Sequence, residues 1–234
     1  TCLPVAAAIE LIHNFSLIHD DIQDDDVERR HFPTVWSVWG KPQAINAGTA
    51  MRVVASLAVS SLNDANIPVE KQLHIQRLLD EGSLILVEGQ YMDIDFESRF
   101  DIKVEHYLEM IGKKTAALIG SSLQVGALIG TENESVVSAW GTIGWNLGMA
   151  FQIRDDILGI WGNEEKTGKP QGSDIQQKKK SLPIVLALEN AEDELSREIL
   201  ATYRHDELTQ KDTAAMLTIL ETMGVQSRAQ TMAL

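Results

Sequence analysis

Two clusters of aspartates interrupt segments that otherwise read as buried helix. Residues 20–26 hold five aspartates at the end of one apolar stretch, and Asp155-Asp156 lies inside another. Acidic side chains are strongly disfavoured in apolar helices unless a cation meets them. The economical explanation is a pair of facing carboxylate walls around divalent metal ions. All-oxygen ligation of this kind suits Mg²⁺, which also takes ligands from substrate phosphates.

The first cluster has the spacing expected of a ligand set. Asp20 and Asp24 are four residues apart and share a helix face, with Asp21 beside them. Like charges at a helix C-terminus, where the dipole is negative, destabilise the bare end, and bound cations relieve this cost. Arg29 and Arg30 follow within ten residues. Carboxylates beside paired arginines indicate a metal-bridged polyanion, because arginine can fork onto phosphate oxygens.

Length and composition narrow the class of protein. The 234 residues fit a single domain, residues 1–234, better than the alternative of two domains. A formal net charge of -14 argues against nucleic acid or an anionic membrane surface as a partner. The single cysteine, Cys2, excludes an internal disulfide and favours a reducing, cytoplasmic location. There is no apolar run of the ~18 residues needed for a transmembrane segment.

The sequence predicts an all-α fold, with no convincing strand and no hairpin signal. Apolar residues recur at helical spacing over most of the chain. The expected helices are Leu3 to about Asp24, Ala44–Leu62, Val69 to about Phe96, Ile102–Ile129, Glu134–Ile160, Ser181–Asn190 and Thr209–Met223. The segments 25–42, 63–68 and 161–180 are expected to be loops or turns.

The second cluster is expected to lie on a helix face with two other polar or aromatic residues. Asp155 follows Phe151 by four residues and Gln152 by three, so we expect all three on one face. Three glycines in the same helix indicate either close helix packing or a face cleared for a ligand: Gly141, Gly144 and Gly148.

The segment beyond the second cluster is rich in lysine. Lys169 and Lys179 are candidates for anion binding. For Lys178 and Lys180 we expect the simpler role of solvated loop residues. His19, next to the first cluster, is expected to pack or to support a ligand rather than to bind metal itself.

Several short blocks follow one another along the chain. They are Leu17-Ile18-His19-Asp20-Asp21-Ile22-Gln23-Asp24, Arg29-Arg30-x-x-Pro33-Thr34, Gly40-x-x-x-Ala44-Ile45-Asn46-Ala47-Gly48, Gly89-Gln90-x-x-Asp93, Lys114-Thr115, Phe151-Gln152-x-x-Asp155-Asp156, Thr167-Gly168-Lys169 and Asp174-x-x-x-x-Lys179-x-Ser181-Leu182-Pro183. This ordered set resembles the trans-isoprenyl diphosphate synthase (polyprenyl synthetase) family, of the geranylgeranyl and farnesyl diphosphate synthase type. The resemblance covers nearly the whole chain.

The resemblance implies roles for individual residues. The metal ligands on the allylic diphosphate would be Asp20, Asp21, Asp24 and Asp155. Contacts to the allylic diphosphate would come from Arg29, Lys114 and Lys179, with Thr115 and Lys169 also at the substrate site. Arg30 would meet isopentenyl diphosphate. Phe151 and Gln152 would line the reacting centre, and Phe15 and Ser16 would set product chain length. The catalytic set is then Asp20, Asp21, Asp24, Asp155, Lys114 and Gln152.

The resemblance also implies a fold, a reaction and an assembly. The fold would be an isoprenoid synthase-type helical bundle around a central cavity. The enzyme would use Mg²⁺ to ionise an allylic diphosphate, and the alkene of isopentenyl diphosphate would attack the allylic carbon before a proton is lost. A bulky Phe15 beside a small Ser16 favours geranylgeranyl diphosphate as product, with farnesyl diphosphate next, over long polyprenyl products. A homodimer is the implied assembly.

The chain departs from the family pattern at two internal positions and at its ends. Thr49 stands where the family often has aspartate. Gly159 stands where the family usually has a third aspartate, so we expect a raised Mg²⁺ requirement that Gly159→Asp would lower. The family's Gly-Lys-x-x-Arg block lies upstream of Thr1. The resemblance therefore implies a domain that lacks N-terminal and some C-terminal family segments.

Two other functions are compatible with the same residues. A class I terpene cyclase-like enzyme shares a helical fold and an aspartate-rich motif, although Arg30 and the 169–183 block favour chain elongation. A non-catalytic partner subunit of a prenyltransferase is the second alternative. Gly159 favours it slightly, and the intact first cluster argues against it.

Overall fold

The chain forms two compact units in the computed structural model, which describes residues 2–62, 67–163, 170–189, 194–205 and 207–234. Unit 1 comprises Thr1–Leu84 and Leu118–Gly144, and unit 2 comprises Ile85–Ala117 and Trp145–Leu234. Helices α4 (Val69–Glu97) and α7 (Glu134–Trp161) contribute residues to both units. The expectation of one domain over residues 1–234 stays a prediction.

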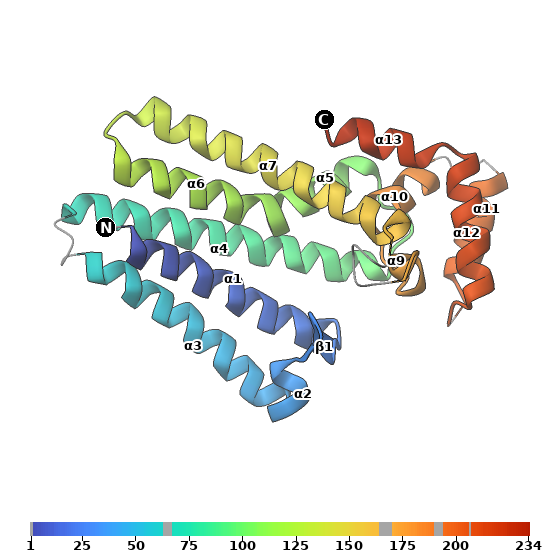
Figure 1. Cartoon of the computed structure of the whole chain (residues 1–234), viewed down its shortest axis with the longest axis horizontal. Coiled ribbons are helices and arrows are strands. Elements are labelled where there is room, and N and C mark those ends of the chain that lie inside the picture. The colour runs from blue at the N-terminus through green and yellow to red at the C-terminus, as the bar shows by residue number, and fades with distance from the viewer. Residues whose placement is uncertain (1, 63–66, 164–169, 190–193, 206) are drawn as a thin grey trace. The chain divides into compact units, whose positions relative to one another are not determined.

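Unit 1 is built around the pairing of its first and third helices. Helix α1 (Leu3–Gln23) lies alongside α3 (Lys41–Ser60) (Figure 1). The buried residues of α1 recur at helical spacing, as do those of α3: Val5, Ala8, Ile12 and Phe15, and Ala44, Gly48, Ala55 and Val59. At Gly48 an added Cβ would lie 2.5 Å from Nε2 of His19, so only glycine allows this approach. His19 therefore has the packing role that we expected.

The connection between α1 and α3 contains the one departure from an all-helical chain within the described residues. Strands β1 (Glu28–Arg29) and β2 (Phe32–Pro33) pair antiparallel, and helix α2 (Val35–Trp39) follows. The expectation of no strand was wrong here. Each strand has only two residues, which is too short to show the alternation of apolar and polar residues that predicts a strand. The hairpin turn is Arg30-His31, with φ of 53° and 66°. Positive φ at both central residues matches the right-handed twist of the strands.

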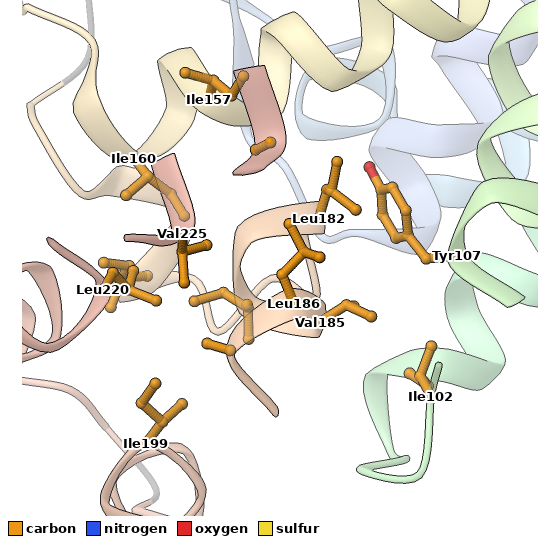
Figure 2. Packing of buried hydrophobic residues seen from close by; sticks show 14 of the residues in the cluster. Ile102, Tyr107, Ile157, Ile160, Leu182, Val185, Leu186, Ile199, Leu220 and Val225 are labelled. Carbon is orange, nitrogen blue, oxygen red and sulfur yellow. The ribbon is translucent and has the colours of Figure 1, made fainter. Parts of the chain in front are cut away.

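Unit 2 surrounds a large apolar core. Helix α10 (Leu182–Leu188) lies in the middle, and nearly all of its residues are buried. Figure 2 shows Leu182, Val185 and Leu186 of this helix between Ile157 and Ile160 of α7 on one side and Tyr107 on the other. The remaining elements are α5 (Val104–Ile111), α9 (Ser173–Gln176), α11 (Glu194–Tyr203), α12 (Gln210–Thr222) and α13 (Val225–Met232).

A π-helical turn separates α5 from α6 (Ala117–Gly130). This turn, η2, covers Gly112–Ala116 and carries Lys113, Lys114 and Thr115. Glycines of two other helices approach it closely. A Cβ at Gly89 of α4 would lie 2.1 Å from the Lys114 nitrogen, and one at Gly148 of α7 would lie 2.5 Å from the Ala116 Cα. The wide turn thus fits between backbones that carry no side chain at the contact.

Most of the predicted helices are confirmed, and the differences are local. The helix expected over residues 102–129 is present as an unbroken helical run from Val104 to Gly130, but its middle, Gly112–Ala116, is the π turn η2. Helices α2, α9, α11 and α13 were missed; each spans ten residues or fewer. The glycines of α7 serve close packing: added Cβ atoms at Gly141 and Gly144 would meet Gln124 and the backbone of Gly120. Within the described residues, no helix is long and apolar enough to cross a bilayer.

Candidate active site

The first aspartate cluster lies at the C-terminal end of α1 in unit 1. Asp21 is the buried member, at 5% exposure, whereas Asp24 and Asp25 are exposed. The Arg29 guanidinium bridges two carboxylates: Nε donates to Asp21 Oδ1 at 2.5 Å, and Nη2 donates to Asp20 Oδ2 at 3.0 Å. Burial raises the pKa of Asp21 above its usual value, and Arg29 opposes this rise. The predicted grouping of Asp20 and Asp21 with Arg29 is therefore present.

The chain after α1 is held in a defined path. Asp25 is left-handed (φ 55°), and Asp26 N–H bonds back to Asp21 O at 3.0 Å, as in a Schellman helix end. The Asp26 carbonyl accepts from Thr34 Oγ1 and from Trp36 Nε1, both at 2.8 Å. These bonds fix the route by which β1 brings Arg29 back to the aspartates.

The second aspartate cluster, in unit 2, separates into a buried and an exposed carboxylate. Asp156 is 1% exposed and accepts from Tyr107 Oη, from Leu182 N at 2.7 Å and from Gln152 Nε2 at 3.1 Å. Burial raises the pKa of Asp156, while Lys179 and these donors oppose the rise. Asp155 is exposed. Asp156 is therefore a structural anchor for α10, and Asp155 is the member that can meet a ligand.

The predicted common face of Phe151, Gln152 and Asp155 was only partly correct. Phe151 and Asp155 are both exposed, but Gln152 is turned toward Asp156. Its Oε1 accepts from Thr115 Oγ1 at 2.8 Å. A hydrogen-bonded chain therefore links Thr115 of η2 through Gln152 to the buried Asp156.

Lys114 and Asp93 form a second link between η2 and its neighbours. Lys114 Nζ lies 2.5 Å from Asp93 Oδ2, one turn beyond Gly89 on α4. The close approach at Gly89 places the η2 backbone where Lys114 can reach this carboxylate. Sequence reasoning gave Asp93 no role, although it lies in the quoted Gly89-Gln90-x-x-Asp93 block.

The three consecutive lysines have three different environments. Lys178 is left-handed (φ 56°), and its Nζ donates to His205 O. Lys179 is exposed. The protein atoms around its ammonium displace water, which alone would lower the pKa of Lys179. Nearby carboxylates of unit 2 outweigh this and raise the pKa: Asp174, Asp156, Asp93 and Asp155. The expectation that Lys178 and Lys180 are solvated loop residues was wrong for Lys180, which is 8% exposed and donates to backbone carbonyls of α4.

A small cavity lies among these side chains. Its lining includes Asp93, Lys114, Gln152, Lys179 and the buried Ser181, and its volume is about 30 Å³. Ser181 Oγ is buried and has no hydrogen-bond partner within the described part of the chain. The cavity suits one water molecule and is too small for a diphosphate. The groups placed to meet an anion are thus those that reach solvent, above all Lys179.

The space beside Gly159 is already filled by another carboxylate. A Cβ at this glycine would lie 2.2 Å from Asp174 Oδ2 and 2.4 Å from Asp174 Cγ. Asp174 is 7% exposed and is carried on α9, whose Ser173 Oγ bonds to Gly159 O at 3.3 Å. An aspartate at position 159 could therefore extend the metal site only if the buried Asp174 carboxylate moved.

We therefore expect Gly159→Asp to destabilise unit 2 without lowering the Mg²⁺ requirement. Overpacking costs about 1–3 kcal/mol, and the new charge beside Asp174 adds to it. Denaturant unfolding of Gly159→Asp and Gly159→Ala checks this, since alanine adds the Cβ without the charge. A stable Gly159→Asp protein that reaches full activity at lower Mg²⁺ would contradict the steric argument.

The other predicted residues are placed as follows. Arg30 is exposed at the tip of the β1–β2 turn. Phe15 is 6% exposed, with its ring edge-on to His19 at 5.7 Å between centroids. Ser16 is partly buried and its Oγ donates to His13 O at 2.7 Å. Lys169 lies outside the described residues.

The carboxylates of the aspartate clusters fit Mg²⁺ only together with oxygen ligands from water or a bound phosphate. Within the ranges that the structure describes, no group of three or more His, Cys, Asp or Glu side chains could hold a metal ion alone. Mg²⁺ is usually bound by one or two carboxylates together with waters and substrate phosphates. Asp20 and Asp21 supply hard oxygen donors of that kind, and Arg29 already shows that the pair can share one cation.

Comparison with known proteins agrees with the all-α fold described above. A model of the polyprenyl synthetase family matches residues 1–220. The chain belongs to the polyprenyl synthetase family, and its fold is the all-α isoprenoid synthase fold.

Two curated relatives and one solved structure illustrate the similarity. Geranylgeranyl diphosphate synthase of Mycobacterium tuberculosis is 42% identical over 201 residues, covering 86% of this chain and 56% of that protein. (2E,6E)-farnesyl diphosphate synthase of Mycobacterium bovis is 45% identical over 187 residues, covering 79% of this chain and 50% of that protein. The structure of geranylgeranyl pyrophosphate synthetase from Pyrococcus horikoshii matches with a TM-score of 0.91 at 40% identity. The match covers 98% of this chain and 69% of that protein. The chain thus spans about half the length of these two curated relatives.

Proposed function

We propose that the protein is a short-chain trans-prenyltransferase that condenses isopentenyl diphosphate with an allylic diphosphate. The observation that carries this proposal is the gathering of Lys114, Lys179, Gln152 and the Asp155-Asp156 pair in one part of unit 2, in a chain of this family. Similar proteins are named geranylgeranyl and farnesyl diphosphate synthases, which supports this substrate class.

The residues act in this proposal by binding and orienting diphosphate groups. Asp20, Asp21, Asp24 and Asp155 would hold Mg²⁺, which stabilises the negative charge that develops on the leaving diphosphate. Arg29 uses two of its N–H donors on the aspartates, and a guanidinium has further donors for a phosphate oxygen.

The remaining assignments concern the second substrate and the reacting centre. Lys114 and Lys179 add fixed positive charge at the allylic diphosphate, and Thr115 and Lys169 would complete that site. Arg30 would bind isopentenyl diphosphate from the exposed hairpin turn. Phe151 would line the reacting centre, with Gln152 held beside it by Thr115.

An assay with purified protein tests the proposal against its alternatives. We expect turnover of an allylic diphosphate only when isopentenyl diphosphate and Mg²⁺ are both present, with release of pyrophosphate and a longer prenyl product. Conversion of the allylic diphosphate alone would indicate a cyclase. Activity that appears only after addition of a second, active homologue would indicate a partner subunit.

We propose geranylgeranyl diphosphate as the main product, with Phe15 setting its length. Phe15→Ala removes a buried ring and is expected to lengthen the product by at least one isoprene unit, while Ser16→Phe is expected to shorten it. Product chain length by chromatography is the measurement, with Phe32→Ala, an exposed ring on β2, as the control. Unchanged products from both variants would place the chain-length determinant elsewhere.

We also propose that the protein is a homodimer. Helix α3 exposes large apolar side chains on its surface, with Val53, Val54 and Leu57 at 47–63% exposure. Exposed apolar groups that gather on one helix are typical of association surfaces. We expect a mass near twice 25.9 kDa in sedimentation, and a shift toward monomer for Leu57→Glu. A monomeric wild-type chain would contradict the proposal.

A further inference from the structure

Lys180 is a buried lysine that binds the end of a helix. Its Nζ lies 2.9 Å from Glu97 O and 3.3 Å from Phe96 O, at the C-terminus of α4. The ammonium also lies 4.3 Å from the centroid of the Phe100 ring. The last carbonyls of a helix lack partners within it and carry partial negative charge, so a lysine there is stabilised. Burying an ammonium is unfavourable unless such partners are present, which fixes the Lys180 side chain in this position.

The backbone on both sides of Lys180 is also tied down. Lys179 N–H donates to Asp174 O at 2.9 Å, and Tyr203 Oη lies 3.4 Å from Lys179 O. Two residues further on, Leu182 N–H donates to Asp156 Oδ2. The backbone from Lys179 to Leu182 is therefore tied to Asp174 at one end and to Asp156 at the other. Lys180 adds a contact to α4 between these two points.

The side chain of Lys179 differs from those of its two neighbours. The side chains of Lys178 and Lys180 both donate to backbone carbonyls, whereas the Lys179 side chain makes no hydrogen bond or ion pair within the described part of the chain. Lys179 is exposed as a residue, and its ammonium lies in the field of several unit 2 carboxylates. It can therefore accept an anionic ligand without first breaking a bond, provided that its position is held.

We propose that Lys180 is a positioning residue, whose bonds to the C-terminal carbonyls of α4 hold Lys179 where it binds a diphosphate. The choice of diphosphate as ligand rests on the proposed function. Removing the Lys180 ammonium leaves Lys179 chemically unchanged but frees the segment from α4. Removing Lys180 should therefore weaken the binding of an anion. This weakening should be seen only in a protein that still has Lys179.

A double-variant cycle on pyrophosphate binding separates positioning from a merely structural role. The probe is inorganic pyrophosphate with Mg²⁺, titrated calorimetrically into the protein. Lys180→Met is expected to weaken binding about tenfold, the scale at which supporting residues affect a bound centre. In a Lys179→Met background the same change should have no further effect. Lys211→Met, an exposed lysine on α12, serves as the control and should bind like the wild type.

Other outcomes overturn the inference. If Lys180→Met lowers the melting temperature but leaves pyrophosphate affinity unchanged, the lysine only caps α4. Equal weakening with and without Lys179 would show that it acts on binding by another route. If Lys180→Met fails to fold, Phe100→Leu provides a second test, because it removes the aromatic ring that contacts the Lys180 ammonium. That variant should weaken binding about threefold, again only when Lys179 is present.

The outcome is distinguishable from failure of the proposed function. Coupled loss of pyrophosphate binding without any prenyl transfer would uphold the role of Lys180 and reject the prenyltransferase. Prenyl transfer by a wild-type protein that does not bind pyrophosphate would reject the role of Lys180 and leave the reaction standing.

Discussion

Replacing Asp21 with alanine is expected to reduce turnover about a thousandfold, because metal stabilisation of a leaving group contributes several kcal/mol. Asp21 is the buried carboxylate of its cluster and the closest partner of Arg29. Its loss removes one of the proposed metal ligands and releases the guanidinium that lies across the cluster. Steady-state kinetics with saturating Mg²⁺ measures the effect.

The same variant should lose its stabilisation by ligand. For the wild type, Mg²⁺ with pyrophosphate at a hundredfold excess over Kd should add about 2.7 kcal/mol to the free energy of unfolding. We expect most of this gain to disappear in Asp21→Ala and also in Asp21→Asn, which keeps the side-chain size. Asp25→Asn, in the same acidic run but paired with Lys41, is the control and should keep the gain. Wild-type activity in Asp21→Ala would show that the metal assignment is wrong.

Replacing Asp156 with alanine is expected to have the largest effect on stability, about 3–5 kcal/mol of unfolding free energy. Tyr107 Oη and Leu182 N–H would both lose their acceptor inside the core of unit 2. Denaturant unfolding measures this loss. Tyr107→Phe should cost less, about 1–2 kcal/mol, because Asp156 keeps its other two donors.

The neighbouring residue gives a matched control for that prediction. Asp155 lies on the same helix but is exposed, so Asp155→Ala should change the unfolding free energy by no more than about 0.5 kcal/mol. If Asp155 holds metal as proposed, its loss should nonetheless abolish activity. Similar stability losses for the two variants would contradict the division between a structural and a ligand-binding aspartate.

The helices were predictable because the chain repeats apolar residues at helical spacing over long segments. Helix α1 was expected from Leu3 to about Asp24 and spans Leu3–Gln23, and α4 was expected from Val69. Local periodicity could not reveal the β1–β2 hairpin, since its turn uses arginine and histidine in place of glycine or asparagine. The turn is held instead by bonds around Asp26 O, which form only after folding.

The site was predictable at the level of residue blocks but not of individual roles. Two adjacent aspartates in a helix look alike in sequence, and only the packing of α10 against α7 makes Asp156 the buried one. Lys180 looked solvated because its partners are backbone carbonyls some eighty residues earlier. Likewise, the filled space at Gly159 depends on Asp174, which approaches it only through the fold.

The π turn at Gly112–Ala116 has a consequence for how this chain is compared with its relatives. A π turn holds one residue more than the α-helical turn it replaces, and each residue of an α-helix advances the side-chain direction by about 100°. Residues before Gly112 and after Ala116 therefore follow two different helical phases. A relative with a regular helix at this point must be aligned with a one-residue gap inside the helix. Without that gap, Lys114 and Thr115 would be equated with positions that point in other directions.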